Sequence, residues 1–139
     1  MERVAEVGVT ARLQFSASHR LHNDDFDDEW NRRVFGKCDN PAGHGHNYTI
    51  EVTVRGELDP VTGMVIDLKD LKDVVRRVIV DTVDHRNLNV DVDFLAGINP
   101  TAENLVVAFW NRLEESLDGV ALEEIRLRET ENNSVVYRG

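Results

Sequence analysis

The sequence predicts an α+β fold in which a four-stranded antiparallel sheet carries two helices packed on one face. Apolar and polar residues alternate along two segments in the first half of the chain, as they do in half-buried strands. Apolar residues then recur at helical spacing in two segments, and two further strand-like segments close the chain. This order, strand-strand-helix-helix-strand-strand, is typical of an antiparallel sheet covered by helices on one side.

The first two strands are predicted over residues 7–18 and 46–58. Apolar residues occupy the odd positions of the first strand and the even positions of the second. Because successive side chains of a strand point to opposite faces, each strand would bury one face and leave the other polar. The segment Asp59–Gly63 then has the composition of a turn.

The two helices are predicted from the change of period that follows this turn. The first helix starts after Asp67, which serves as its N-cap, and the second starts near Thr101, directly after a proline. The closing strands are predicted over residues 121–130 and 134–138.

Composition limits the class of protein. A chain of 139 residues and 15.8 kDa, with 41% apolar residues, has the size of a single domain over residues 1–139. Its formal net charge of −10 makes it a poor general binder of nucleic acid or of anionic membranes. With one cysteine, no apolar leader and no run long enough for a membrane span, we expect a cytoplasmic protein.

Three histidines are predicted to converge at one end of the sheet. His19 continues the apolar face of the first strand, whereas His44 and His46 precede the apolar face of the second. If the two strands pair antiparallel, the three imidazoles meet on one face, which is the donor set of a zinc site with an open fourth position. His22 is an alternative to His19, although its position in a loop gives it no defined face.

The connection from Arg20 to Gly43 is predicted to be a long loop without regular structure, and such loops tend to be functional. Its acidic run, from Asp24 to Glu29, is interpreted as a solvated segment.

Cys38 lies in this connection, six residues before His44, and three interpretations remain open. It could be a fourth ligand that closes a structural zinc site, a reactive thiol that acts as a base or nucleophile, or an inert buried thiol. The neighbouring cation, Lys37, favours the reactive thiol among these interpretations.

Two further groups could move protons or hold a ligand. Asp84 could orient its neighbour His85 as a general acid or base, or both could simply end a helix. Glu129 shares the apolar face of its strand with Leu127, so its carboxylate requires a partner. That partner could be a ligand with two N–H donors or an internal arginine, or the carboxylate could reach solvent at the end of the strand.

Seven segments together are similar to those of a known family. The matched segments are Phe15–His22, Val34–Cys38, Asn40–Tyr48, Asp59–Met64, Val83–His85, Thr101–Asn104 and Glu129–Tyr137. On these segments the chain resembles the 6-pyruvoyl tetrahydropterin synthase family, a group of tunnelling-fold pterin enzymes. The resemblance covers nearly everything after residue 11.

The resemblance implies a role for each matched position. It implies that three histidines bind Zn²⁺, that a cysteine abstracts a proton with the help of an aspartate–histidine relay, and that a glutamate anchors the pterin and assists catalysis. These positions are His19, His44 and His46 for zinc, Cys38 for the base, Asp84 with His85 for the relay, and Glu129 for the pterin. Thr101 and Glu103 are implied to lie in the segment that helps to seat the pterin.

The resemblance also implies an assembly in which three subunits close a barrel and two trimers stack into a homohexamer. Active sites would then lie between subunits, and the polar sheet face would line a tunnel. The implied reaction converts 7,8-dihydroneopterin triphosphate to 6-pyruvoyl tetrahydropterin with loss of triphosphate. Candidate cations for the triphosphate are Arg12, Arg20, Arg33 and Lys37.

Two alternatives remain at this point. A related enzyme of queuosine biosynthesis, 6-carboxy-tetrahydropterin synthase, uses the same substrate, but its cysteine typically precedes the His-Gly-His motif by three intervening residues. Here five residues intervene between Cys38 and His44, which favours the pyruvoyl reaction. The other alternative is an inert pterin-binding oligomer in which Cys38 completes a structural zinc site.

Overall fold

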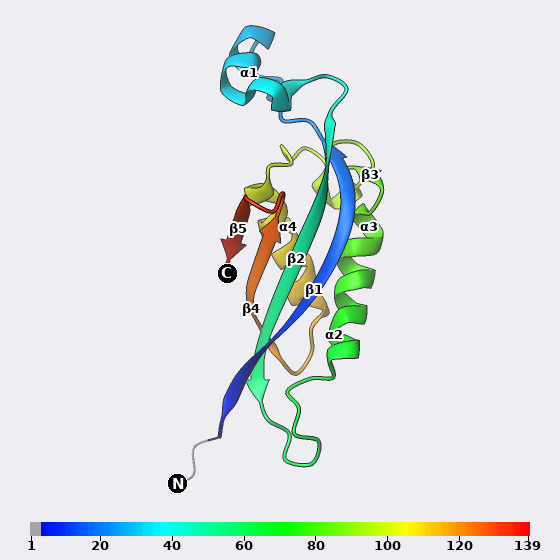
Figure 1. The fold of residues 1–139 in the computed structure, drawn as a ribbon, viewed down its shortest axis with the longest axis vertical. Coiled ribbons are helices and arrows are strands. Elements are labelled where there is room, and N and C mark those ends of the chain that lie inside the picture. The colour runs from blue at the N-terminus through cyan, green and yellow to red at the C-terminus, as the bar shows by residue number, and fades with distance from the viewer. Residues whose placement is uncertain (1–3) are drawn as a thin grey trace.

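The computed structural model describes residues 4–139, which form a five-stranded mixed sheet with helices on one side (Figure 1). The strand order is β3-β1-β2-β4-β5. The strands are β1 (Glu6–His19), β2 (His44–Glu57), β3 (Arg86–Asn87), β4 (Ala121–Arg128) and β5 (Ser134–Tyr137). The helices are α1 (Asp28–Phe35), α2 (Leu68–Val75), α3 (Asp81–Val83) and α4 (Ala102–Ser116).

The α+β class and the order of the predicted elements are confirmed, but the four-stranded antiparallel sheet is wrong in one respect. The short strand β3 pairs parallel to β1 and adds a fifth strand. The residues on either side of β3 bind the end of β1, where His85 N and Leu88 N donate to the carbonyls of Ser16 and Ser18. A two-residue strand has no alternation to detect, so only its neighbour in space reveals it.

The helical segments begin where the capping residues indicate. The side chain of Asp67 accepts a hydrogen bond from Lys69 N at the start of α2, and that of Thr101 accepts one from Asn104 N at the start of α4. A π-helical turn at Arg76–Val80 joins α2 to α3, so the predicted first helix is one helical run with an irregular centre.

The connection between β1 and β2 is not the structureless loop that the sequence predicts. It contains α1 and a 3₁₀ turn at Gly36–Asp39. Asp27 caps α1 by accepting from Trp30 N at 2.8 Å, so part of the acidic run starts a helix, although all of that run is exposed. Figure 1 shows α1 at one end of the molecule, beyond the end of the sheet.

A buried asparagine organises this end. The Asn31 amide donates to the carbonyls of Asn23, Phe26 and Asp27, and its oxygen accepts from Asn23 N at 2.7 Å. Asn31 is fully buried, so α1 is held to the preceding loop by a polar centre as well as by stacked aromatic rings.

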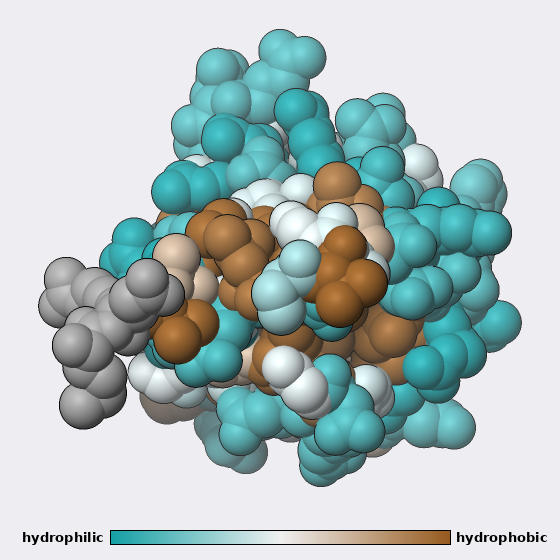
Figure 2. Space-filling view, turned by 90° about the horizontal axis from the view of Figure 1, so that it is seen from below, coloured by the Kyte–Doolittle hydropathy of each residue, from teal (hydrophilic) through white to brown (hydrophobic). Residues whose placement is uncertain are grey.

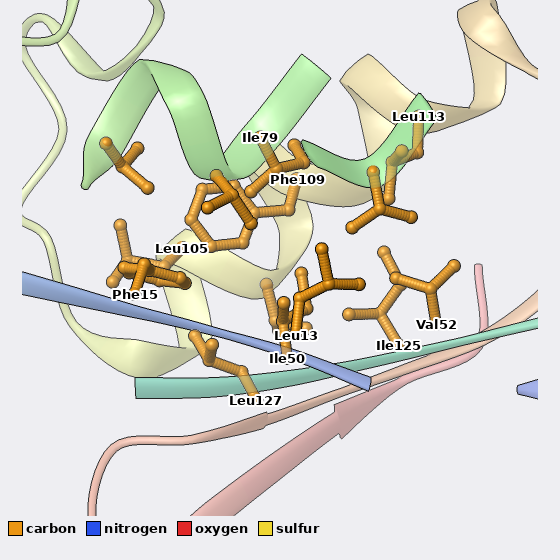
Figure 3. Close-up of a cluster of buried hydrophobic side chains, with 14 of the residues drawn as sticks. Leu13, Phe15, Ile50, Val52, Ile79, Leu105, Phe109, Leu113, Ile125 and Leu127 are labelled. Atoms are coloured by element: carbon orange, nitrogen blue, oxygen red, sulfur yellow. The ribbon is translucent and has the colours of Figure 1, made fainter. Parts of the chain in front are cut away.

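The hydrophobic core lies between the sheet and α2–α4 (Figure 3). Leu13 and Phe15 of β1 and Ile50 of β2 are buried, as the strand pattern predicts. Phe15 stacks on Tyr48 with ring centroids 4.9 Å apart and meets Phe109 of α4 edge to face. This packing fixes the ends of β1 and β2, where the chemistry-bearing residues lie.

The opposite face of the sheet is polar. Thr10 and Thr53 share a hydrogen bond of 2.6 Å, and Arg55 pairs with Glu123 at 2.6 Å. Among residues 4–139, no helix combines the length and the apolar character that crossing a bilayer requires.

Candidate active site

The pairing of β1 with β2 brings three imidazoles together. His19 ends β1 and is the register partner of His44, which starts β2, while His46 lies opposite Ala17. One ring nitrogen from each histidine lies within 4.8 Å of the other two. The Nε2 atoms of His19 and His44 are 3.1 Å apart. Nitrogens bound to one zinc ion at about 2.0–2.1 Å would lie about 3.3 Å apart in tetrahedral geometry.

The surroundings of His19 set its protonation. Its Nδ1 donates to the carbonyl of Pro100 at 2.8 Å, which leaves the Nε2 lone pair directed towards the other two rings. Burial lowers the pKa of His19 and also that of His46, so both rings favour the neutral form that binds metals.

His46 shows that the cluster is suited to a metal. Its Nε2 is buried and has no hydrogen-bond partner in the described part of the chain, and the Glu129 carboxylate oxygen is 3.6 Å away. An unsatisfied buried nitrogen is costly, and a bound cation would satisfy it. The three histidines therefore fit a metal ion. Within residues 4–139, neither Cys38 nor His22 belongs to this group of potential ligands.

A cavity of about 620 Å³ opens beside His46 on the polar side of the sheet. Its walls include Arg12 from β1, Asn47 from β2 and Glu129, which directly follows β4. Its size is that of ordinary small-molecule sites. The cavity therefore has a carboxylate next to the histidine cluster, at 3.6 Å from His46 Nε2.

Asp84 also lines this cavity and contacts its neighbour His85. The Asp84 Oδ2 to His85 Nδ1 distance is 3.0 Å, and Ser16 N donates to Asp84 Oδ1 at 2.9 Å. The Ser16 N–H lowers the pKa of Asp84, and His85 lowers it further. His85 has a φ of 61° and a side chain that is 84% exposed, so its ring projects from the surface.

Several predicted residues do not line this cavity in the described chain; besides His19, His44 and the exposed His85, these are Cys38, Thr101 and Glu103. Cys38 is half-buried in the 3₁₀ turn, Thr101 caps α4, and Glu103 is exposed in the first turn of α4. The cavity thus brings together His46, Glu129 and Asp84, whereas the carbonyl of Cys38 accepts a hydrogen bond from Leu21 N, two residues beyond His19.

Other contributors to the site are missed by sequence reasoning. The Pro100 carbonyl and the Ser16 N–H are backbone groups, and nothing in a side-chain pattern signals them. His22 and Asp39 form a third group, in which His22 Nδ1 lies 2.6 Å from the Asp39 carboxylate. The signal that could have found it is an acidic residue directly after Cys38.

Comparisons with known proteins agree with this arrangement. The family model described as 6-pyruvoyl tetrahydropterin synthase matches residues 8–139. A protein of Poecilia reticulata named 6-pyruvoyl tetrahydrobiopterin synthase is 52% identical over 134 residues, which cover 96% of this chain and 91% of that protein. The human protein of the same name is 47% identical over 137 residues, covering 99% and 94%.

A solved structure, that of Caenorhabditis elegans 6-pyruvoyl tetrahydropterin synthase, has the same fold. It superposes with a TM-score of 0.93 at 41% identity and covers 100% of this chain and 99% of that one. Together, the family match and the identities above show that the chain belongs to the 6-pyruvoyl tetrahydropterin synthase family.

Proposed function

We propose that the protein is a zinc-dependent lyase that converts 7,8-dihydroneopterin triphosphate to 6-pyruvoyl tetrahydropterin and releases triphosphate. The observation that carries the proposal is the cluster of three histidines beside a cavity that contains Glu129, with one buried nitrogen that no group of residues 4–139 satisfies. The relatives named 6-pyruvoyl tetrahydrobiopterin synthase support the same reaction.

The proposed metal is Zn²⁺, held by His19, His44 and His46. Three neutral imidazoles are a donor set of catalytic zinc sites, which keep a further position open. When bound, zinc supplies a Lewis acid that makes C–H bonds next to substrate oxygens more acidic. The Pro100 carbonyl would keep His19 in the tautomer that coordinates.

The protein's own groups bind the pterin and move protons. Glu129 presents two carboxylate oxygens, which match a pair of N–H donors on one edge of a pterin ring. The Sγ of Cys38 takes a carbon-bound proton from the substrate side chain, and triphosphate leaves as the carbon–oxygen bond breaks. Asp84 accepts the Nδ1 proton of His85, which leaves the exposed Nε2 to pass a proton. Thr101 and Glu103 are proposed to help to seat the pterin.

We place the complete site between subunits of a homohexamer built as a dimer of trimers. Cys38 does not line the cavity that holds Asp84 and Glu129 in the described chain, so a second copy would complete the site around each thiol. The polar face of the sheet, which carries Arg12 and Arg128, would line a tunnel, and closure into a barrel would cover the sheet edges.

An exposed apolar end supports the stacking of copies. Figure 2 shows apolar residues gathered on the end of the molecule where β1 begins and α2 starts. Exposed apolar residues in these segments are Val4, Val7, Leu58, Val61, Met64 and Leu68. Exposed apolar residues that gather on one end of a molecule are typical of interaction surfaces. We expect the assembly to work as single-domain subunits in the cytoplasm.

The decisive experiment incubates the purified, zinc-loaded protein with 7,8-dihydroneopterin triphosphate and identifies products by anaerobic mass spectrometry. We expect 6-pyruvoyl tetrahydropterin and triphosphate. A 6-carboxy product with acetaldehyde would assign the protein to queuosine biosynthesis. Bound zinc without turnover would favour an inert pterin-binding oligomer and contradict the proposal.

A further inference from the structure

We propose that Asp39 is a positioning residue, which clamps the turn carrying Cys38 to the three residues that follow the metal-binding end of β1. The catalytic meaning of this clamp rests on the proposed function, because it concerns where the base of that reaction is held. The clamp itself is a property of the fold and can be measured without any substrate.

The Asp39 carboxylate is the centre of the clamp. Its residue is only 5% exposed, and its Oδ1 lies 2.6 Å from His22 Nδ1 and 3.1 Å from Arg20 Nη2. A buried carboxylate is costly without such partners, so the two donors and the acceptor hold one another in place.

The backbone reinforces the same contact. Arg20 Nε donates to the carbonyl of Asp39 at 2.8 Å, and Leu21 N donates to the carbonyl of Cys38 at 2.8 Å. Three consecutive residues, Arg20 to His22, therefore bind two consecutive residues, Cys38 and Asp39. Four hydrogen bonds or ion pairs connect segments that are 17 or more positions apart.

The β1 side of the clamp is firmly anchored. His19 is held by the Pro100 carbonyl, and Arg20 exchanges hydrogen bonds with the side chain of Asn89 through both its backbone N–H and its carbonyl. Arg20 is thus engaged with Asp39 and Asn89, which gives it a role other than that of a free cation for the triphosphate.

The other side has little support of its own. Figure 1 shows α1 and the turn after it at the end of the molecule, beyond the sheet. The backbone bonds after the turn are local, from Asn40 N to the Lys37 carbonyl and from Gly43 N to the Asn40 carbonyl. The position of Cys38 relative to the histidines therefore depends on the clamp, and a misplacement of about 1 Å can lower a rate about 100-fold.

The geometry makes a specific distinction between two substitutions. Both side-chain contacts of Asp39 go to a single oxygen, Oδ1. An asparagine keeps an acceptor oxygen at that place, whereas an alanine removes it. Asp39→Asn should therefore retain the position of Cys38, and Asp39→Ala should lose it. Asp25→Ala is the matched control, since it removes an exposed carboxylate from the same connection.

The test measures the thiol and the reaction separately. Cys38 is the one cysteine of the sequence, so the rate of alkylation by iodoacetamide reports on it alone. In zinc-loaded Asp39→Ala we expect alkylation at least about threefold faster, because the half-buried thiol is released, with a kcat about 10- to 100-fold lower at nearly unchanged KM and zinc content. Asp39→Asn and Asp25→Ala should match the wild type.

An alkylation rate in Asp39→Ala equal to or below that of the wild type would overturn the proposal, as would an Asp39→Asn variant as impaired as Asp39→Ala. If Asp39→Ala does not fold, Arg20→Lys replaces it. Lysine keeps the charge but cannot bind the Asp39 backbone carbonyl and the Asp39 Oδ1 at the same time. An unchanged alkylation rate in Arg20→Lys would then overturn it. A wild type without turnover would contradict the proposed function, while the alkylation rates would still test the clamp.

Discussion

Whether a histidine can bind a metal depends on whether its ring nitrogen already has a hydrogen-bond partner. His46 has a buried nitrogen without a hydrogen-bond partner among residues 4–139, whereas His22 is bound to Asp39 and Asp24. Both histidines are candidate zinc ligands in the sequence, yet the structure gives their side chains different surroundings. Their alanine variants therefore form a matched pair.

We expect His46→Ala to lower zinc affinity at least about 100-fold, since loss of a direct ligand should exceed the effect of losing an outer partner. His22→Ala should retain zinc. The measurement is zinc content by mass spectrometry after dialysis against a weak chelator. Equal zinc retention in the two variants would show that His46 is not a ligand.

Substitution of Cys38 distinguishes a catalytic thiol from a structural zinc ligand. We expect Cys38→Ala to keep its zinc and its thermal stability while kcat falls by about 10²–10⁴, the usual contribution of a positioned acid or base. Zinc content and turnover are measured on the same sample. Simultaneous loss of zinc and stability would instead identify a closed structural site.

The lowered pKa of Asp84 predicts that the stability of the fold depends on pH. Because the Ser16 N–H holds the pKa of Asp84 below its ordinary value, its ionised form stabilises the folded state above about pH 4. This contribution is lost as pH falls through the lowered pKa. Asp84→Asn should therefore be less stable than the wild type at neutral pH, and the difference should shrink on acidification.

Urea unfolding of both proteins from pH 7 down to about pH 3.5 tests this expectation. Thr82→Ser, which keeps its hydroxyl and carries no charge, is a suitable control because its difference from the wild type should not depend on pH. A constant difference between Asp84→Asn and the wild type at every pH would contradict the proposed stabilisation by charge.

At the scale of an element, α1 depends on a polar centre. Asn31 is buried and satisfies four backbone groups of the loop before the helix. We expect Asn31→Ala to weaken this end by about 1–3 kcal/mol, the usual cost of leaving buried polar groups unpaired. Arg33→Ala, on the exposed side of α1, is the control.

Hydrogen exchange over residues 23–39 is the suitable measurement, because the loss should be local. Exchange should accelerate there in Asn31→Ala and remain unchanged in the core strands. Equal acceleration in β2 would show that α1 unfolds only together with the whole subunit.

At the scale of the whole molecule, Cys38 and the Asp84–His85 pair belong to different regions of one chain. If the active site forms between subunits, two inactive variants can complement one another. Random mixing of Cys38→Ala with His85→Ala in equal amounts should restore about one quarter of the sites when each site takes these residues from two chains.

The mixture is prepared by joint refolding with zinc, and its turnover is compared with that of each variant alone. A mixture of Cys38→Ala with Cys38→Ser should stay inactive. If the mixture of Cys38→Ala with His85→Ala also stays inactive, both residues serve the same site from the same chain.

Much of the fold could be predicted because its long elements carry periodic patterns. The β1 and β2 strands alternate over many residues, and the caps Asp67 and Thr101 mark the helix starts. The fifth strand and α1 could not be predicted, since β3 has two residues and α1 has only one buried residue. Short elements are held by neighbours in space, which leave no period in the sequence.

By itself, the sequence determined which side chains share a face. The alternation along β1 and β2 is enough to place His19, His44 and His46 together, because successive side chains of a strand point to opposite faces. Only the tertiary structure decided the rest: the Pro100 carbonyl on His19, the unsatisfied nitrogen of His46, and the Asp39 clamp on Cys38. These contacts join residues that are distant in the chain, and several of them use backbone groups, which no side-chain pattern reveals. Only the packing of the folded chain determines which of these groups meet.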